Sequence, residues 1–307
     1  MKQLIAFDLD GTLTESKQPL STEMAALLSR LLSVAEVAVI SGGDWPQFDK
    51  QVASRLPDNT ARSRLWLMPT TGTKLYRFVD DAWQAIYAEL FDDIEKTKIR
   101  IAFDRALAEA KLVDKHIWGE RIEDRGSQIT FSGLGQDAPL KEKERWDPDR
   151  TRRTQLQKTL RAALPGLSIT LGGTTSIDVT RPGVDKGYGL KRLSAESGVP
   201  LDEMLFLGDA LYPGGNDYPA TEIGLDTVRV RDVAETASVI AAIRQGMSNE
   251  APLPSLCDSQ PVVESPAPAA PEPKRYYLSE AFALIAQYGS LEAAEAALTE
   301  ARDEAQG

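Results

Sequence analysis

The sequence predicts an α/β protein: a Rossmann-like core with a parallel sheet, an α+β domain inserted into that core, and a C-terminal helical extension. Short apolar runs near both ends of the core alternate with amphipathic helical patterns, which is typical of βαβ units. Several of these runs end in Asp, Ser or Gly, as strands do where a parallel sheet carries functional groups. Between them, longer helical patterns mix with alternating strands, which indicates the inserted domain.

The first part of the core is expected to contain three strands and a helix. The apolar runs 4–7, 37–40 and 65–68 are too short for helices and are predicted to be strands. Ser21 or Thr22 can cap the helix between the first two strands. Its apolar positions recur with the helical period: Met24, Leu27, Leu28, Leu31 and Leu32. This strand–helix–strand order predicts parallel pairing.

The inserted domain is predicted to span residues 81–183. Residues 84–112 have the pattern of one long or two shorter amphipathic helices. Ile129 and Phe131 alternate with polar neighbours, as in a half-buried strand. Two further strands are expected at 167–171 and 176–179.

The core pattern returns after residue 184, so the core should consist of residues 1–80 and 184–246. Its remaining elements are, in order, a helix at about 188–197, strands at 204–207 and 227–230, and a closing helix at 233–243. Residues 247–275 hold seven prolines and are predicted to be a linker. Residues 276–307 regain helical patterns, and these helices could bind a partner or pack on the core.

Composition excludes several classes of function. A formal net charge of −11 over 307 residues disfavours nucleic acid as a partner. Cys257 is the only cysteine and His116 the only histidine, which argues against disulfides, His-rich metal sites and Ser-His-Asp chemistry. No apolar stretch is long enough to span a membrane, so no membrane contact is expected and a cytoplasmic location is predicted.

Five side chains at predicted strand ends and in one loop fit phosphoryl transfer through a carboxylate. Asp8 and Asp10 follow the first strand, Ser41 the second and Asp209 a later one, while Lys186 lies in a loop before a helix. Asp8 could attack the phosphoryl group and form an acyl phosphate. Because its charge repels the incoming phosphate, a metal ion and a cation such as Lys186 must offset that repulsion.

The other groups then take distinct roles. Mg²⁺ prefers oxygen ligands, which Asp8 and Asp209 can supply together with the backbone carbonyl of Asp10. The Ser41 hydroxyl and backbone N–H groups around Gly42 can bind phosphoryl oxygens. Asp10 can protonate the leaving oxygen and then deprotonate the attacking water or hydroxyl. Taken singly, Ser41 could merely cap a helix and Asp8 and Asp10 could form a turn.

These segments together resemble the four ordered motifs of the haloacid dehalogenase superfamily. They are Phe-Asp-Leu-Asp-Gly-Thr-Leu-Thr at 7–14, Ser-Gly-Gly at 41–43, Lys186, and Gly208-Asp209 followed by Asn216-Asp217. The position of the inserted domain resembles subclass IIB, which includes sugar phosphatases and eukaryotic-type phosphomannomutase. The resemblance implies a Mg²⁺ cofactor, a sugar phosphate or similar small phosphorylated substrate, and a mobile cap. It also implies that Asn216 and Asp217 orient the metal ligands without binding the metal themselves.

Within the cap, the resemblance implies that Arg125, Ser176 and Asp178 bind the substrate. A surface ion pair or strand hydrogen bonds could also explain these three residues. Where the family's phosphomannomutases have further arginines for a distal phosphate, this chain has Gln136 and a charged run containing Lys143 and Arg145. Gln136 lacks a bidentate cationic group.

We therefore expect hydrolysis of a small phosphate monoester, with mutase activity on hexose 1- and 6-phosphates as the alternative. A non-catalytic binding protein on the same scaffold is a third hypothesis. A homodimer through the cap could also form.

Overall fold

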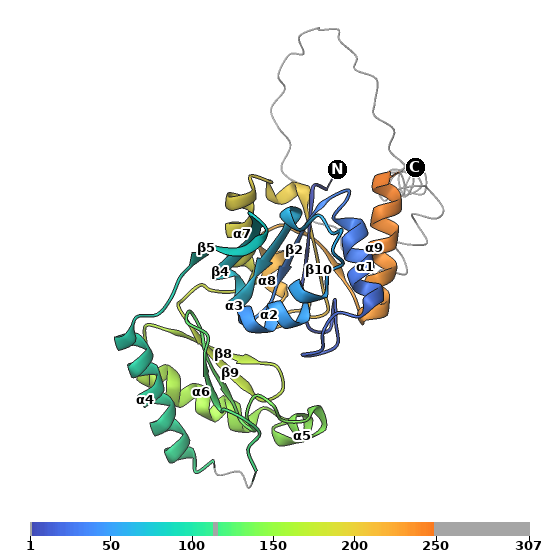
Figure 1. Cartoon of the computed structure of the whole chain (residues 1–307). Coiled ribbons are helices and arrows are strands. Elements are labelled where there is room, and N and C mark those ends of the chain that lie inside the picture. Colours follow the sequence, from blue (N-terminus) through green and yellow to red (C-terminus); the bar gives the residue numbers. More distant parts are fainter. Residues whose placement is uncertain (1, 113–115, 249–307) are drawn as a thin grey trace, which may run out of the picture.

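The computed structural model describes residues 2–112 and 116–248. From residue 249 on, the linker and the C-terminal helices expected from the sequence lie outside the described residues. Within them, the chain folds into a core and an inserted cap, which Figure 1 shows below the core. No helix of the described residues is both long enough and apolar enough to cross a bilayer.

The core is built on a seven-stranded sheet with the order β11-β10-β1-β2-β3-β4-β5. Five neighbouring strands are parallel: β11 (Asp226–Arg229), β10 (Met204–Gly208), β1 (Leu4–Phe7), β2 (Glu36–Ile40) and β3 (Leu65–Met68). At one edge, β4 (Lys74–Val79) and β5 (Ala82–Ala88) continue the sheet in antiparallel fashion. β1 lies near the middle and is fully buried, as expected for an uninterrupted apolar strand covered on both faces.

Helices cover both faces of this sheet (Figure 1). One face packs against α1 (Thr22–Leu31), α2 (Trp45–Gln51) and α9 (Val233–Ser248), and the other against α7 (Lys186–Ser197) and α8 (Tyr218–Glu222). Ser21 caps α1 as expected, since its hydroxyl accepts a hydrogen bond from the Met24 N–H. Short elements complete the core: α3 (Pro69–Gly72) and 3₁₀ turns at Ala53–Arg55, Arg62–Arg64 and Leu201–Glu203.

The cap has its own sheet and its own apolar core. Four antiparallel strands have the order β6 (Ile122–Asp124), β7 (Ile129–Ser132), β9 (Ser176–Thr180) and β8 (Ser168–Gly172). Three helices accompany them: α4 (Asp93–Ala110), α5 (Leu140–Trp146) and α6 (Thr151–Ala163). Phe103 of α4 and Leu156 of α6 pack with Phe131 of the sheet in the centre of this domain. The mixed α+β character expected for the insertion is confirmed.

Three boundaries differ from those expected from the sequence. Residues 84–88 form part of β5 rather than a helix, because Trp83 and its neighbours pair with β4. Trp83 and Tyr87 are four residues apart, as on one face of a helix, but pairing with β4 overrides this local pattern. The core sheet therefore extends past residue 80, and the cap begins after Ala88. Helix α7 begins at Lys186, capped by Asp185, and α9 continues to Ser248, into the segment expected to be a linker.

Candidate active site

The three parallel strands at the centre of the sheet deliver acidic and hydroxyl groups to one edge. Phe7 pairs with Leu207 on one side and Val39 on the other, so Asp8 and Asp209 end neighbouring strands and Ser41 follows the third. The Asp8 N–H donates to the Leu207 carbonyl over 2.9 Å, which continues the sheet as far as the nucleophile candidate. Parallel pairing thus brings these residues together at the carboxyl edge of the sheet, where open α/β sheets bind ligands.

Lys186 connects the first and last of the sequence motifs. Its ammonium group donates to Asp8 Oδ1 and to Asp217 Oδ1, and its side chain is only 2% exposed. Asp217 is itself fixed, because its Oδ2 accepts the Ala210 N–H over 2.9 Å. A buried ammonium group with two carboxylate partners is a fixed positive charge beside the nucleophile, as the sequence predicts for phosphoryl transfer. Flanking carboxylates also raise the pKa of Lys186 despite burial, so the group stays charged.

Asp8, Asp209 and Asp217 form a compact group of carboxylates. One oxygen from each lies within 4.8 Å of the others. Three carboxylates against one ammonium leave excess negative charge, which suits a divalent cation with oxygen ligands. The carboxylates of Asp8 and Asp209 are the better candidates to hold Mg²⁺. Both oxygens of Asp217 accept hydrogen bonds from Lys186 and Ala210, whereas Asp8 Oδ2 accepts only a long one from Thr12, over 3.5 Å. Gly11 (φ +91°) makes room for this group: a Cβ there would approach Asp209 Oδ2 to 2.8 Å.

The charge state of Asp8 depends on this crowded environment. Burial, opposed by Lys186 and reinforced by Asp217 and Asp209, raises the pKa of Asp8 to about 7. Burial and Asp217 also raise the pKa of Asp209. A bound divalent cation would favour the ionised carboxylates, which is the form that a nucleophile requires.

Asp10 lies apart from the carboxylate group and has its own partners. Its Oδ1 accepts the Lys17 N–H over 2.6 Å and a hydrogen bond from Gln51, and its Oδ2 accepts from Gln47 over 3.3 Å. The side chain is therefore oriented by a loop and by helix α2 rather than by the other acids. This separate placement fits the predicted role as proton donor and acceptor; coordination of a metal through its backbone carbonyl stays a prediction. Asn216 lies exposed in the loop before Asp217.

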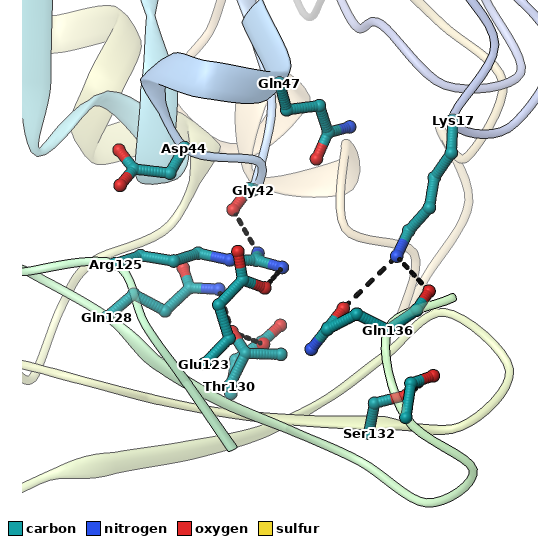
Figure 2. A network of polar contacts seen from close by, with 12 residues as sticks. Lys17, Gly42, Asp44, Gln47, Glu123, Arg125, Gln128, Thr130, Ser132 and Gln136 are labelled. Atoms are coloured by element: carbon teal, nitrogen blue, oxygen red, sulfur yellow. Dashed lines mark hydrogen bonds and ion pairs between the residues drawn. The ribbon is translucent and has the colours of Figure 1, made fainter. Parts of the chain in front are cut away.

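On the cap side, Arg125 reaches across to the core (Figure 2). Its guanidinium donates to the Gly42 carbonyl over 2.6 Å and to Glu123 over 2.6 Å. Asp178 lies near Arg125 and accepts a hydrogen bond from the Thr130 hydroxyl over 2.8 Å. Burial raises the pKa of Asp178, and the charge of Arg125 opposes that shift. Arg125 and Asp178 are thus brought together, and Ser176 lies half-buried two residues before Asp178 on strand β9. Their contact with a substrate stays a prediction.

Lys143, of the charged run noted in the sequence, and Lys17, which the sequence did not single out, converge on Gln136. Lys17, from the loop after Asp10, donates to its backbone and side-chain oxygens over 3.3 and 3.2 Å (Figure 2). Lys143 of α5 donates to the same backbone oxygen over 2.9 Å. Burial, followed by the charge of Lys17, lowers the pKa of Lys143 to about 8. Among the described residues, Gln136 Nε2 is buried with no hydrogen-bond partner.

The sequence offered partial signals for these two residues. The sequence shows the charged run around Lys143 but not where the Lys143 side chain points. For Lys17, nothing local in the sequence indicates a contact with another domain. The structure thus supplies two cations at the position where Gln136 suggested that one was missing.

A parallel sheet that presents a buried Asp–Lys pair under an α+β cap defines a phosphoryl-transfer enzyme of the haloacid dehalogenase superfamily. Solved structures support this class of fold. The IMP-nucleotidase of Plasmodium falciparum superposes with a TM-score of 0.60 at 14% identity, covering 81% of this chain and 70% of that one. A trehalose-6-phosphate phosphatase related protein does so with a TM-score of 0.50 at 18% identity, covering 80% and 100%. At these identities the likeness concerns the fold alone.

Sequence comparison identifies the family. The family model for eukaryotic phosphomannomutase matches residues 24–241. The phosphomannomutase of Schizosaccharomyces pombe is 30% identical over 223 residues, covering 71% of this chain and 84% of the relative. Phosphomannomutase 1 of Homo sapiens is 29% identical over 223 residues, covering 70% and 81%. The chain belongs to the eukaryotic phosphomannomutase family.

Proposed function

We propose that the protein is a phosphomannomutase-like phosphotransferase that interconverts hexose 1- and 6-phosphates. The observation that carries the proposal is the convergence of Lys17 and Lys143 on Gln136. A mutase must hold a phosphate at either end of the sugar, and Gln136 alone favoured hydrolysis for want of a cation. The two ammonium groups at that position supply the positive charge whose absence had favoured hydrolysis over the mutase. The curated relatives, which are named phosphomannomutases, support the same activity.

The proposed reaction uses the core residues in two half-reactions. An Asp8 oxygen attacks the phosphorus of a hexose bisphosphate, the P–O bond to the sugar breaks, and Asp10 protonates the departing sugar oxygen. In the second half, a hexose monophosphate presents its free hydroxyl, and Asp10 takes the proton from it. Its oxygen attacks the aspartyl phosphate, which frees Asp8 and forms the hexose bisphosphate again, while the monophosphate left by the first half is the product. Lys186 stays beside the nucleophile throughout and offsets the charge of the phosphoryl oxygens.

The residues present fit a Mg²⁺ cofactor, with Asp8 and Asp209 as its carboxylate ligands. When bound, the ion would neutralise phosphoryl charge and favour the ionised nucleophile. Ser41 and the N–H groups after it are proposed to bind the phosphoryl oxygens. Arg125, Ser176 and Asp178 are proposed to contact the sugar phosphate from the cap.

Hydrolysis of a sugar phosphate or similar monoester is the second candidate function. It shares the first half-reaction and differs only in the acceptor, since water would attack the aspartyl phosphate in place of a sugar hydroxyl. The observation in its favour is that Gln136 and two lysines offer no bidentate guanidinium for a distal phosphate. A homodimer, a partner of the C-terminal helices and a cytoplasmic location also stay predictions.

One experiment separates the two activities. Mannose 1-phosphate would be incubated with the protein, Mg²⁺ and a trace of hexose 1,6-bisphosphate, and the products followed by ³¹P NMR. Mannose 6-phosphate as the main product supports the mutase. Inorganic phosphate as the main product would replace the proposal with hydrolysis. The Asp8→Asn variant serves as the control for a contaminating phosphatase, because it lacks the nucleophile.

A further inference from the structure

The Ser41–Gly43 segment, here named the phosphate turn, has all three of its carbonyl oxygens held by hydrogen bonds. The Ser41 carbonyl accepts the Thr71 N–H and the Gly43 carbonyl accepts the Thr70 N–H, both over 2.8 Å. The Gly42 carbonyl accepts from Arg125 of the cap. A trans peptide unit directs its C=O and the N–H of the next residue in opposite directions. These three bonds therefore also set where the N–H groups of Gly42, Gly43 and Asp44 point.

The two core contacts come from Thr70–Thr73, here named the threonine loop, and this loop is strained. Thr70 and Thr71 have φ values of +48° and +60°, in the left-handed region that β-branched residues rarely adopt. Such a conformation persists only where surrounding contacts hold it, and it is commonly found next to functional sites. Its two N–H groups meet the phosphate turn as a direct result of this conformation.

The cap adds a contact to the threonine loop, in which the Thr73 hydroxyl and N–H already donate to the Thr70 carbonyl over 2.8 and 3.2 Å. Ser127 Oγ lies 2.6 Å from Thr73 Oγ1 and donates to Thr70 Oγ1 over 3.0 Å, while the two threonine hydroxyls lie 2.7 Å apart. All three side chains are at most 2% exposed. Ser127 belongs to the β6–β7 turn, two residues after Arg125, so the same cap turn touches the phosphate turn directly and through the threonine loop.

Residues 89–91, which join core and cap, contact both the threonine loop and the β6–β7 turn of the cap. The Glu89 N–H donates to the Thr73 carbonyl and the Phe91 N–H to the Gly126 carbonyl, each over 2.9 Å. A rotation of the cap about this segment would therefore move Ser127 relative to Thr73. With the cap in the position seen here, Ser127 completes the buried hydroxyl cluster.

We propose that the Ser127–Thr73–Thr70 hydroxyl cluster is a joint through which cap closure orders the phosphate turn, with Ser127 as its positioning residue on the cap. The inference deepens the proposed function, because it assumes that the Ser41–Gly43 turn binds the phosphoryl group. Ser127 acts through Thr70 and Thr73 and is not expected to touch the substrate. The joint serves transfer to water and transfer to a sugar equally, since both need a closed phosphoryl site.

The test is a double-mutant cycle on the joint. Ser127→Ala removes the cap hydroxyl. Thr73→Val removes one of its two core partners with little change in shape, together with the hydrogen bond from the Thr73 hydroxyl to the Thr70 carbonyl. The readout is the affinity for orthovanadate in the presence of Mg²⁺, measured by calorimetry on the full chain, because vanadate occupies a phosphoryl site without a sugar. Each single variant should weaken vanadate binding by at least about three- to tenfold, since each removes more than one neutral hydrogen bond of the cluster. The double variant should be little weaker than either single one.

Ser194→Ala is the matched control. The Ser194 hydroxyl also donates one hydrogen bond, to the Val199 carbonyl over 2.7 Å, but at the far end of α7. It should bind vanadate as the unaltered chain does, and thermal melting of all variants shows whether they stay folded. Effects of Ser127→Ala and Thr73→Val that simply add, or that match the control, would overturn the inference, as would a complete absence of vanadate binding. A hydrolase product pattern in the NMR experiment, with the vanadate coupling intact, would overturn the mutase proposal alone.

Discussion

The two ends of the proposed site are built in different ways. At the core end, Asp8, Lys186 and Asp217 are buried, and the contacts among them stay within one domain. At the cap end, the contacts of Arg125 and Lys17 cross from one domain to the other. The difference indicates that phosphoryl chemistry rests on a fixed arrangement, while the choice of substrate and acceptor depends on where the cap lies.

The largest effect is expected at the core end. Asp8→Asn removes the nucleophile and should lower kcat by at least about a thousandfold, as loss of a catalytic group does in other covalent mechanisms. Rapid-quench mass spectrometry after incubation with a hexose bisphosphate should show a phosphorylated protein for the unaltered chain only. Substantial turnover by the variant would mean that another group attacks the phosphorus.

Changes at the cap end should affect binding and product choice more than the chemical step. Lys17→Met or Lys143→Met would remove one of the two ammonium groups proposed to hold a distal phosphate. Either variant should raise KM for hexose phosphates about ten- to a hundredfold. The fraction of inorganic phosphate among the products should rise as well.

Lys158→Met is the matched control for these two variants. It removes the same charge from an exposed position on the cap helix α6. If all three variants behave alike, Lys17 and Lys143 do not form a phosphate-binding pair.

The sequence predicted the core end of this comparison better than the cap end, for a physical reason. Asp8, Ser41 and Asp209 follow short apolar strands, and parallel pairing necessarily gathers the ends of such strands. Lys17 and Lys143 carry no such local signal, because their meeting depends on how two domains dock. The same limit explains strand β5: the spacing of Trp83 and Tyr87 suits a helix, and only pairing with β4 makes it a strand.

The carboxylates of the core end should make Mg²⁺ binding depend on pH. Asp8, with its pKa raised to about 7, must lose a proton before it can hold the ion. Below that pH the apparent affinity should therefore fall about tenfold for each pH unit, which calorimetry at about pH 6 and about pH 8 can measure. An affinity that stays constant between these values would contradict the raised pKa.

Without Mg²⁺, the raised pKa of Asp8 also changes the free energy of unfolding with pH, in the direction opposite to its effect on Mg²⁺ affinity. Between the ordinary pKa of 3.8 and the raised value of about 7, the folded chain keeps a proton on Asp8 that the unfolded chain has released. This group therefore makes the folded state less stable as pH rises through that window. Chemical denaturation in EDTA should show the fall, and Asp8→Asn should reduce it.

The smallest effect concerns the strained backbone between the two ends. Thr71, at φ +60°, is a β-branched residue in a left-handed conformation, which costs on the order of 1–2 kcal/mol. Asparagine tolerates this region better, so Thr71→Asn should raise the free energy of unfolding by up to about 1 kcal/mol in urea denaturation. The Thr71 N–H that holds the Ser41 carbonyl is part of the backbone and is retained, so vanadate affinity should not change. A loss of stability would mean that the threonine side chain contributes more to this loop than its backbone strain costs.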